Sequence, residues 1–157
     1  MGTDVELLAL DEKIKNLQKI EEEKDKYNNQ VIKEKKRHLM EMKQFFDGVL
    51  KRISDTGIRC IRASFGKYEV IASHQKEEFR VTIKRISEED YSEYPIYANL
   101  LPIDQMEEES SDLLFLYYPD IKEAILQEFE KLVDEEYNKC KVRISSQKKM
   151  LETIDRL

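Results

Sequence analysis

The chain has 157 residues, and its 33 acidic and 27 basic side chains give a formal net charge of -6. Glycine (4) and proline (3) are scarce and the apolar residues are periodic, which favours long helices over a disordered chain. No apolar run approaches the roughly 20 residues of a membrane span, and the first residues lack a signal-peptide layout. We therefore expect a cytoplasmic protein without a membrane partner, whose Cys60 and Cys140 are reduced thiols.

Charge is distributed unevenly along the chain. Residues 1–56 and 121–157 are each neutral, residues 57–86 carry +4, and residues 87–120 carry -10 with no Lys or Arg. This partition indicates two scaffold arms around a chemically different centre. We predict a single elongated domain, 1–157, composed of a helical arm at 4–56, a basic β-meander at 57–86, an acidic Tyr-rich segment at 87–118 and a helical arm at 119–157.

The first arm opens with a capping box, Thr3-Asp4-Val5-Glu6, which predicts a helix that starts near Asp4. Gly57 accepts the left-handed conformation that ends helices, so we expect the helix to stop there. Between these points, two sets of apolar residues follow coiled-coil spacing but differ in register by one residue. The sets are Leu7, Leu10, Ile14 and Leu17, and then Leu39, Met42, Phe46, Val49 and Ile53.

The last arm is predicted to start at Pro119, because Pro suits a first helical turn and Asp120 with Glu123 has capping-box spacing. A heptad stripe follows at Val133, Tyr137, Cys140, Ile144, Gln147, Leu151 and Ile154. The predicted fold class is therefore α+β. The two terminal helices would pair as an antiparallel coiled-coil hairpin, with the meander and an acidic irregular segment between them.

In that hairpin Ile53 would lie near Ile121 and Leu157 would end opposite Leu17. The start of the first arm would then project past its partner and expose an apolar tip. Burying each such side chain is worth about 1.5–3 kcal/mol, so the tip is a candidate protein-binding surface. The alternative is that the terminal helix bends back and covers itself. The tip consists of Leu7, Leu8, Leu10 and Ile14.

Between the arms the apolar period changes to alternation, which predicts three antiparallel strands at 58–64, 68–73 and 79–84. Phe65-Gly66 supplies the first turn. The outward face of this meander is basic, and it is a candidate site for a small anionic ligand or nucleotide. The residues proposed for that site are Arg59, Arg62, Arg80 and Lys84.

The acidic segment holds five of the eight tyrosines. Tyrosine beside a carboxylate suits an exposed contact surface for a partner with a basic surface. It equally suits an aromatic flap folded over the sheet, with Glu88, Glu89 or Asp90 facing Arg80, Lys84 or Arg85. The candidate contact residues are Tyr91, Tyr94, Tyr97, Glu107, Glu108, Glu109 and Asp112.

Motifs for catalysis are missing from the sequence. It contains no G-x-S-x-G, Walker loop, G-x-G-x-x-G or H-E-x-x-H, and we expect its two histidines, His38 and His74, to be solvated. We therefore predict a protein that is not an enzyme and needs no cofactor or metal. The acidic segment beside the basic strands also argues against direct binding of nucleic acid.

Three functions stay open at this point. The leading hypothesis is a scaffold or adaptor that binds or occludes another protein, and that forms a homo-oligomer through its helical arms. The first alternative is an acidic inhibitor that mimics nucleic acid and occupies a basic groove on a nucleic-acid-handling enzyme. The second is capture of a small anion by the basic sheet.

Overall fold

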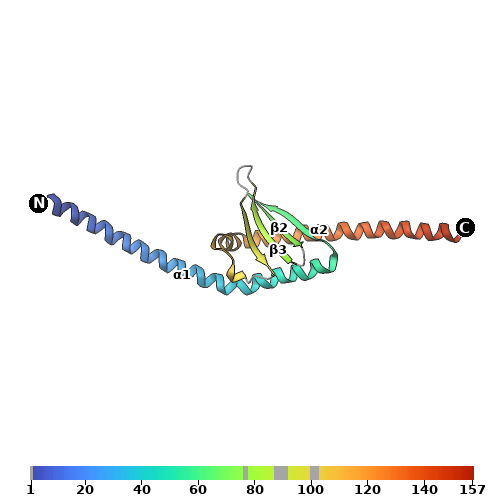
Figure 1. Cartoon of the computed structure of the whole chain (residues 1–157), viewed down its shortest axis with the longest axis horizontal. Helices are drawn as coiled ribbons and strands as arrows, with labels where there is room; N and C mark the ends of the chain where they lie inside the picture. The colour runs from blue at the N-terminus through green and yellow to red at the C-terminus, as the bar shows by residue number, and fades with distance from the viewer. Residues whose placement is uncertain (1, 76–77, 87–91, 100–102) are drawn as a thin grey trace. The chain divides into compact units, whose positions relative to one another are not determined.

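The computed structural model describes residues 2–75, 78–86, 92–99 and 103–157, except for the side chains of Gln75 and Asp104. It holds two long helices and a four-stranded antiparallel sheet, so the fold is α+β as predicted (Figure 1). The chain divides into two compact units, Met1–Met42 and Lys43–Leu157. The elements are α1 (Gly2–Thr56), β1 (Cys60–Phe65), β2 (Tyr68–Gln75), β3 (Glu78–Arg85), β4 (Glu93–Ala98), the 3-10 helix η1 (Ile103–Gln105) and α2 (Glu108–Asp155).

The unit Met1–Met42 is made by α1 alone. Every residue from Gly2 to His38 is exposed except Lys35, which is half-buried. Because α1 is one continuous helix, it does not fold back to cover its own apolar tip. No helix within the described residues is both long and apolar enough to cross a membrane.

Two glycines end elements where the sequence predicts. Gly57 follows the last residue of α1 with φ +74°, a conformation that side chains with a Cβ adopt at a cost. Gly66 has φ +53° in the two-residue turn between β1 and β2, where Phe65 pairs with Tyr68. Both stop signals are confirmed.

The sheet is a meander of order β1-β2-β3-β4 in which every neighbouring pair is antiparallel. Its first three strands confirm the predicted ones. The fourth was missed, because the sequence predicted an irregular segment where β4 lies. Pro95 and Glu93 disfavour a strand in general, but β4 is an edge strand, where a proline does not break the ladder. The ladder between β3 and β4 shifts register between Val81 and Thr82.

One face of the sheet holds the core of the unit Lys43–Leu157. In β3 the buried residues alternate with half-buried or exposed ones, as expected for a sheet covered on one side. α2 packs on β1, β2 and β4. The last turns of α1 contribute Phe46, Val49 and Ile53 to the same core, and α2 contributes Leu114, Ile121 and Ile125.

α2 begins at Glu108, eleven residues before the predicted start at Pro119. The prediction was wrong because proline is typical of a first helical turn, whereas Pro119 lies inside the helix with its ring exposed. Residues 108–112, predicted as part of an acidic loop, are therefore helical, and so are residues 113–118, for which a strand or a helical turn was expected. Buried Leu114, Ile121 and Ile125 recur at helical spacing, so burial of this face stabilises the helix through the proline.

The predicted pairing of the arms into a coiled-coil hairpin is not confirmed. Next to the sheet the two helices touch, since the rings of Phe45 and Tyr118 meet edge to face at 6.1 Å. Farther along, every residue of α2 from Val133 to the end of the chain is exposed, including the whole heptad stripe.

Replacing Pro119 by Ala tests the continuity of α2. An interior proline removes one backbone hydrogen bond and costs a helix up to about 3 kcal/mol. We expect Pro119→Ala to raise the free energy of unfolding by about 1–3 kcal/mol in urea titrations. An unchanged or lowered stability would instead indicate that a helix starts at Pro119.

Candidate functional site

The apolar stripe of α2 is a long ordered feature that the fold leaves uncovered. Val133, Tyr137, Ile144, Leu151 and Ile154 are exposed at 36%, 61%, 50%, 60% and 52%. Their alternating spacing of four and three residues places them along one side of the helix. A side chain in a protein core would be almost fully buried, so this stripe has the pattern of an interface without its partner.

The stripe lies on a different side of α2 from the face that packs on the sheet. Ile121 and Ile125 are fully buried against the domain, whereas the next residue, Leu126, is 47% exposed. Successive residues are rotated by about 100° around a helix, so Leu126 starts the stripe beside the domain without belonging to its core. Pro119 and Glu123, on the same side as Leu126, are exposed as well. This side of α2 is therefore accessible from the domain to the C-terminus.

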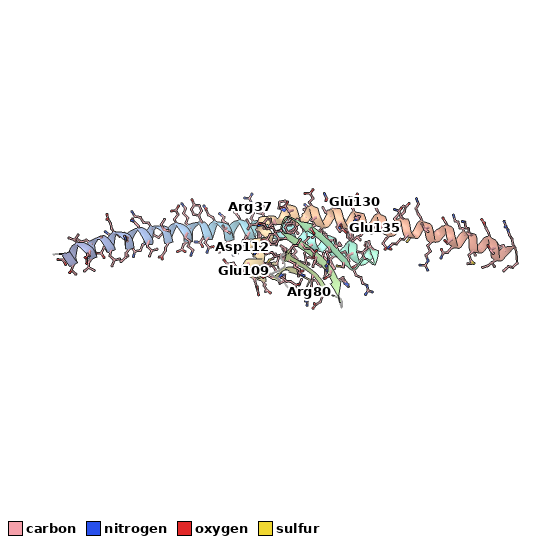
Figure 2. The ribbon with its side chains drawn as sticks, turned by 90° about the horizontal axis from the view of Figure 1, so that it is seen from above. Arg37, Arg80, Glu109, Asp112, Glu130 and Glu135 are labelled. Carbon is pink, nitrogen blue, oxygen red and sulfur yellow. The ribbon has the colours of Figure 1, made fainter. Side chains whose placement is uncertain are left out.

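Charged groups lie within the stripe and around it. Glu130 occupies one stripe position, and Glu135 projects from another side of α2 (Figure 2). Lys141 Nζ lies 5.0 Å from the centre of the Tyr137 ring, and Lys139 Nζ lies 3.5 Å from Glu136 Oε1. Exposed contacts of this kind contribute about 0–1 kcal/mol each, so they can be exchanged for contacts with a partner at little loss.

The apolar tip of α1 is a second uncovered surface, in the unit Met1–Met42. Leu7, Leu8, Leu10 and Ile14 are exposed at 52%, 66%, 50% and 43%. The structure thus places the predicted tip residues in solvent, as a binding surface requires. Their binding role stays a prediction.

Tyr97, predicted as part of an exposed contact surface, is a core residue and only 7% exposed. Its ring stacks on Phe46 of α1 at 5.2 Å between centres, and Phe79 lies 5.9 Å away. Its hydroxyl donates a hydrogen bond to the carboxylate of Asp47. Burial, followed by this hydrogen bond and the negative charge of Asp47, raises the pKa of the Tyr97 hydroxyl above its ordinary value near 10.

The other described tyrosines of the segment also lie against the domain. Tyr94 is half-buried on β4 and Tyr118 is half-buried on α2. Tyr117 packs on the hairpin of β1 and β2, with its ring 5.9 Å from Phe65 and 5.2 Å from Tyr68. These placements agree with the reading of an aromatic cover rather than a free contact surface. Tyr91 lies outside the described residues.

The acidic run forms the start of α2. Glu107 occupies the position before the helix, and Glu108 and Glu109 lie in its first turn. Glu109 and Asp112 project from these first turns (Figure 2). Carboxylates are stabilised by the positive end of the helix dipole by about 0.3–1 kcal/mol each. The helix start thus supplies a structural reason for Glu108 and Glu109 that needs no basic partner.

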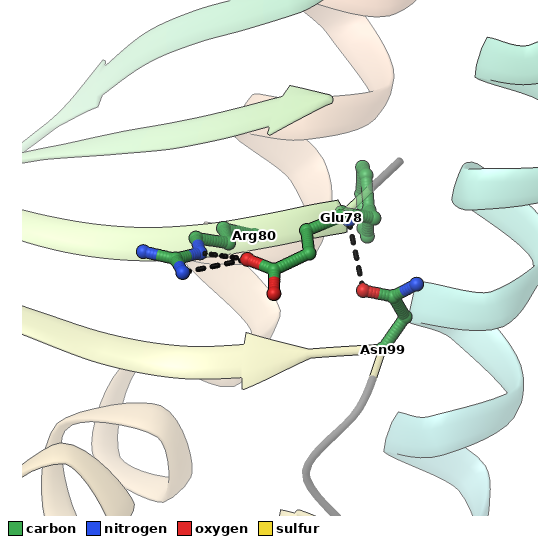
Figure 3. Close-up of polar contacts among 4 residues, drawn as sticks. Glu78, Arg80 and Asn99 are labelled. Carbon is green, nitrogen blue, oxygen red and sulfur yellow. Dashed lines mark hydrogen bonds and ion pairs between the residues drawn. The ribbon is translucent and has the colours of Figure 1, made fainter. Parts of the chain in front are cut away.

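The basic residues of the outer sheet face lie close to carboxylates of the same sheet. Arg62 Nη1 lies 3.7 Å from Glu69 Oε1. Arg80 donates from Nε and Nη2 to Glu78 Oε2 at 3.0 and 2.6 Å (Figure 3). Lys84 pairs in register with Glu69 on one side and Glu93 on the other.

An anion bound by Arg62, Arg80 and Lys84 together would therefore be repelled by a carboxylate beside each of them. Arg59 precedes β1 and is exposed, and its backbone carbonyl accepts from the His74 amide at 2.8 Å. The predicted facing of Arg80 and Lys84 by Glu88, Glu89 or Asp90 lies outside the described residues.

Asn99 extends the pairing of β3 and β4 beyond the end of β4. Its side-chain oxygen accepts from the Phe79 backbone N–H at 2.9 Å (Figure 3), and its own backbone N–H donates to the Phe79 carbonyl at 3.2 Å. Both polar groups of the Phe79 backbone are thereby satisfied where the ladder ends. Asn99 has a structural role that gives no sign of chemistry.

The described residues beside β4 form one small hollow. A hollow of about 240 Å³ lies between β4 and η1, lined by Ile96, Tyr97, Ile103 and Met106 among others. Ligand pockets are usually larger, at about 300–1,000 Å³, and hold convergent polar groups. Among the described residues no three His, Cys, Asp or Glu side chains are grouped as metal ligands would be. Cys60 and Cys140 are free and exposed.

Comparisons of the chain with models of protein families, with curated proteins and with solved structures give no match. The candidate site therefore rests on the geometry of the stripe and the tip.

The stability of the unit Lys43–Leu157 should depend on Tyr97 in a pH-dependent way. Tyr97→Phe removes a hydrogen bond to a carboxylate, and we expect it to lower the free energy of unfolding by about 1.5–3 kcal/mol at pH 8. Because the folded-state pKa is raised, this advantage of Tyr97 is complete below about pH 10 and falls as the pH rises further. Urea titrations from pH 8 to 11 measure the difference.

Tyr27→Phe is the matched control, since Tyr27 is 58% exposed on α1. It should follow the unsubstituted chain at every pH. A stability difference between Tyr97→Phe and the unsubstituted chain that stays constant up to pH 11 would contradict the buried, hydrogen-bonded state of Tyr97.

Proposed function

We propose that this protein is a non-enzymatic interaction protein, a scaffold or adaptor that binds protein partners through the exposed apolar stripes of its helical arms. The observation that carries the proposal is the α2 stripe from Val133 to Ile154, which is exposed along its whole length. The small domain beside it has its own closed core, so the stripe is not needed to complete the fold. Partner binding gives the stripe a role.

The energetics of a bare helix support this proposal. Most of the stability of a protein helix comes from packing of an apolar face, and a helix without such packing is marginal in water. Burial of each large apolar side chain adds about 1.5–3 kcal/mol, so a partner that covers several stripe residues stabilises both itself and α2.

The stripe could also be covered within one chain, by pairing of α2 with α1 in the predicted hairpin. Its register would place Tyr137 near Arg37 and Leu151 near Glu23. Such a register sets apolar stripe residues against charged ones and leaves much of the α2 stripe without an apolar partner. We therefore favour pairing between chains over the hairpin.

Substitution within the stripe tests the proposed function. Ile144→Glu with Leu151→Glu places charges where a partner would bury apolar surface. We expect this variant, used as bait in extracts of the native host, to lose the partners that the unsubstituted chain captures, by about tenfold or more in quantitative mass spectrometry.

Val142→Glu is the matched control, because Val142 is 68% exposed on α2 but lies away from the stripe. It should retain the partners. Equal recovery of partners by the stripe variant and the unsubstituted chain would show that the stripe is not the binding surface.

A further inference from the structure

The charges along the exposed part of α2 are segregated in a way that selects a partner. Residues 128–136 contain five acidic side chains and one basic side chain, whereas residues 137–149 contain five basic side chains and no acidic one. Both blocks flank the same apolar stripe, and every residue from Val133 onward is exposed. An acidic block followed by a basic block is complemented by the same sequence running in the opposite direction.

We propose that α2 pairs with α2 of a second copy of this chain, as an antiparallel coiled coil with its two-fold axis between Asn138 and Lys139. This inference deepens the proposed function by naming the partner of the stripe, and it rests on that function. The paired length runs from Leu126 to Leu151, about 38 Å at 1.5 Å per residue.

The stripe itself fits this register. The stripe alternates between heptad positions d (Val133, Cys140) and a (Tyr137, Ile144). In an antiparallel pair a position d of one helix faces a position a of the other, so Val133 meets Ile144 of the second copy and Tyr137 meets Cys140. At the ends Leu126 meets Leu151. The two polar positions of the stripe, Glu130 and Gln147, then face each other in one layer. Apolar residues thus meet apolar residues, and the polar layer helps to define the register.

The flanking charges fit the same register. Asp134 lies beside Lys141 of the second copy, and Glu136 lies beside Arg143. The two-fold symmetry repeats both pairs, so four opposite-charge contacts border the stripe. A parallel, in-register pair would instead place Glu130 against Glu130 and the whole basic block beside its own copy. The antiparallel arrangement is therefore favoured by charge as well as by packing.

Crosslinking of the full chain tests both the pairing and its direction. In a Cys60→Ser, Cys140→Ala background, three variants carry Val133→Cys, Ile144→Cys or both. Positions 133 and 144 lie about 16 Å apart along one helix, so a bismaleimide linker much shorter than that cannot join them within a chain. Light scattering of the unsubstituted chain gives the mass in solution.

We expect a mass of twice 18.8 kDa, and a covalent dimer only when both cysteines are present. Covalent dimers of either single-cysteine variant would indicate a parallel pair and overturn the proposal. A monomer at all concentrations up to about 100 μM, or a dimer without any crosslink through these positions, would overturn it as well.

Charge reversal gives a second test with an internal control. Lys141→Glu with Arg143→Glu should weaken the dimer by about tenfold or more, because four attractive contacts become repulsive. Adding Asp134→Lys and Glu136→Arg to the same chain should restore dimerisation to within about threefold. If restoration fails, the register is wrong.

The same samples separate this inference from the proposed function. A monomeric chain that still loses its captured partners on stripe substitution keeps the proposed function and overturns only self-pairing. A dimer of the proposed register supports both.

Discussion

The one-sided sheet is the constraint on which the rest of the structure depends. Four short strands offer a single apolar face, and that face is covered by the last turns of α1 and the first part of α2. Tyr97 joins the two sides of this core, because its ring stacks on Phe46 and its hydroxyl binds Asp47. Once this small core is closed, the remainder of each helix has no apolar surface in its own unit on which to pack.

The exposed stripes follow from this constraint. α2 continues for more than twenty residues beyond its last fully buried residue, Ile125, and keeps a heptad pattern to its end. A heptad pattern does not stabilise a helix that stays unpaired in solvent. In a helix that pairs, the same pattern adds stability and fixes the relative orientation of the two helices. The segregated charges of residues 128–149 add selectivity, since they disfavour a parallel copy.

Much of the fold follows from local sequence signals. Alternating residues predicted β1 to β3, Gly57 marked the end of α1 and Gly66 marked a turn, because each signal depends on neighbours only. The start of α2 was misplaced because Pro119 has a local preference that burial of Leu114 and Ile121 overrides. β4 was missed because its pairing with β3 permits Pro95 at an edge.

In the candidate site, too, local sequence patterns predicted some features and tertiary contacts decided the others. The apolar residues of the α2 stripe and the α1 tip were visible in the sequence, because periodicity alone reveals them. Tyr97 was misassigned because a tyrosine suits both an exposed contact and a core with one polar partner, and only Asp47 in α1 decides between them. The structural role of the carboxylates near Glu108 likewise depends on where α2 begins.

Hydrogen exchange of the full chain at increasing protein concentration tests the central claim, that the far part of α2 is stabilised by a second copy. We expect residues 133–151 to exchange fast at low micromolar concentration and to become protected as concentration rises, while β2 and β3 are equally protected throughout. Protection of residues 133–151 that is independent of concentration would contradict the claim.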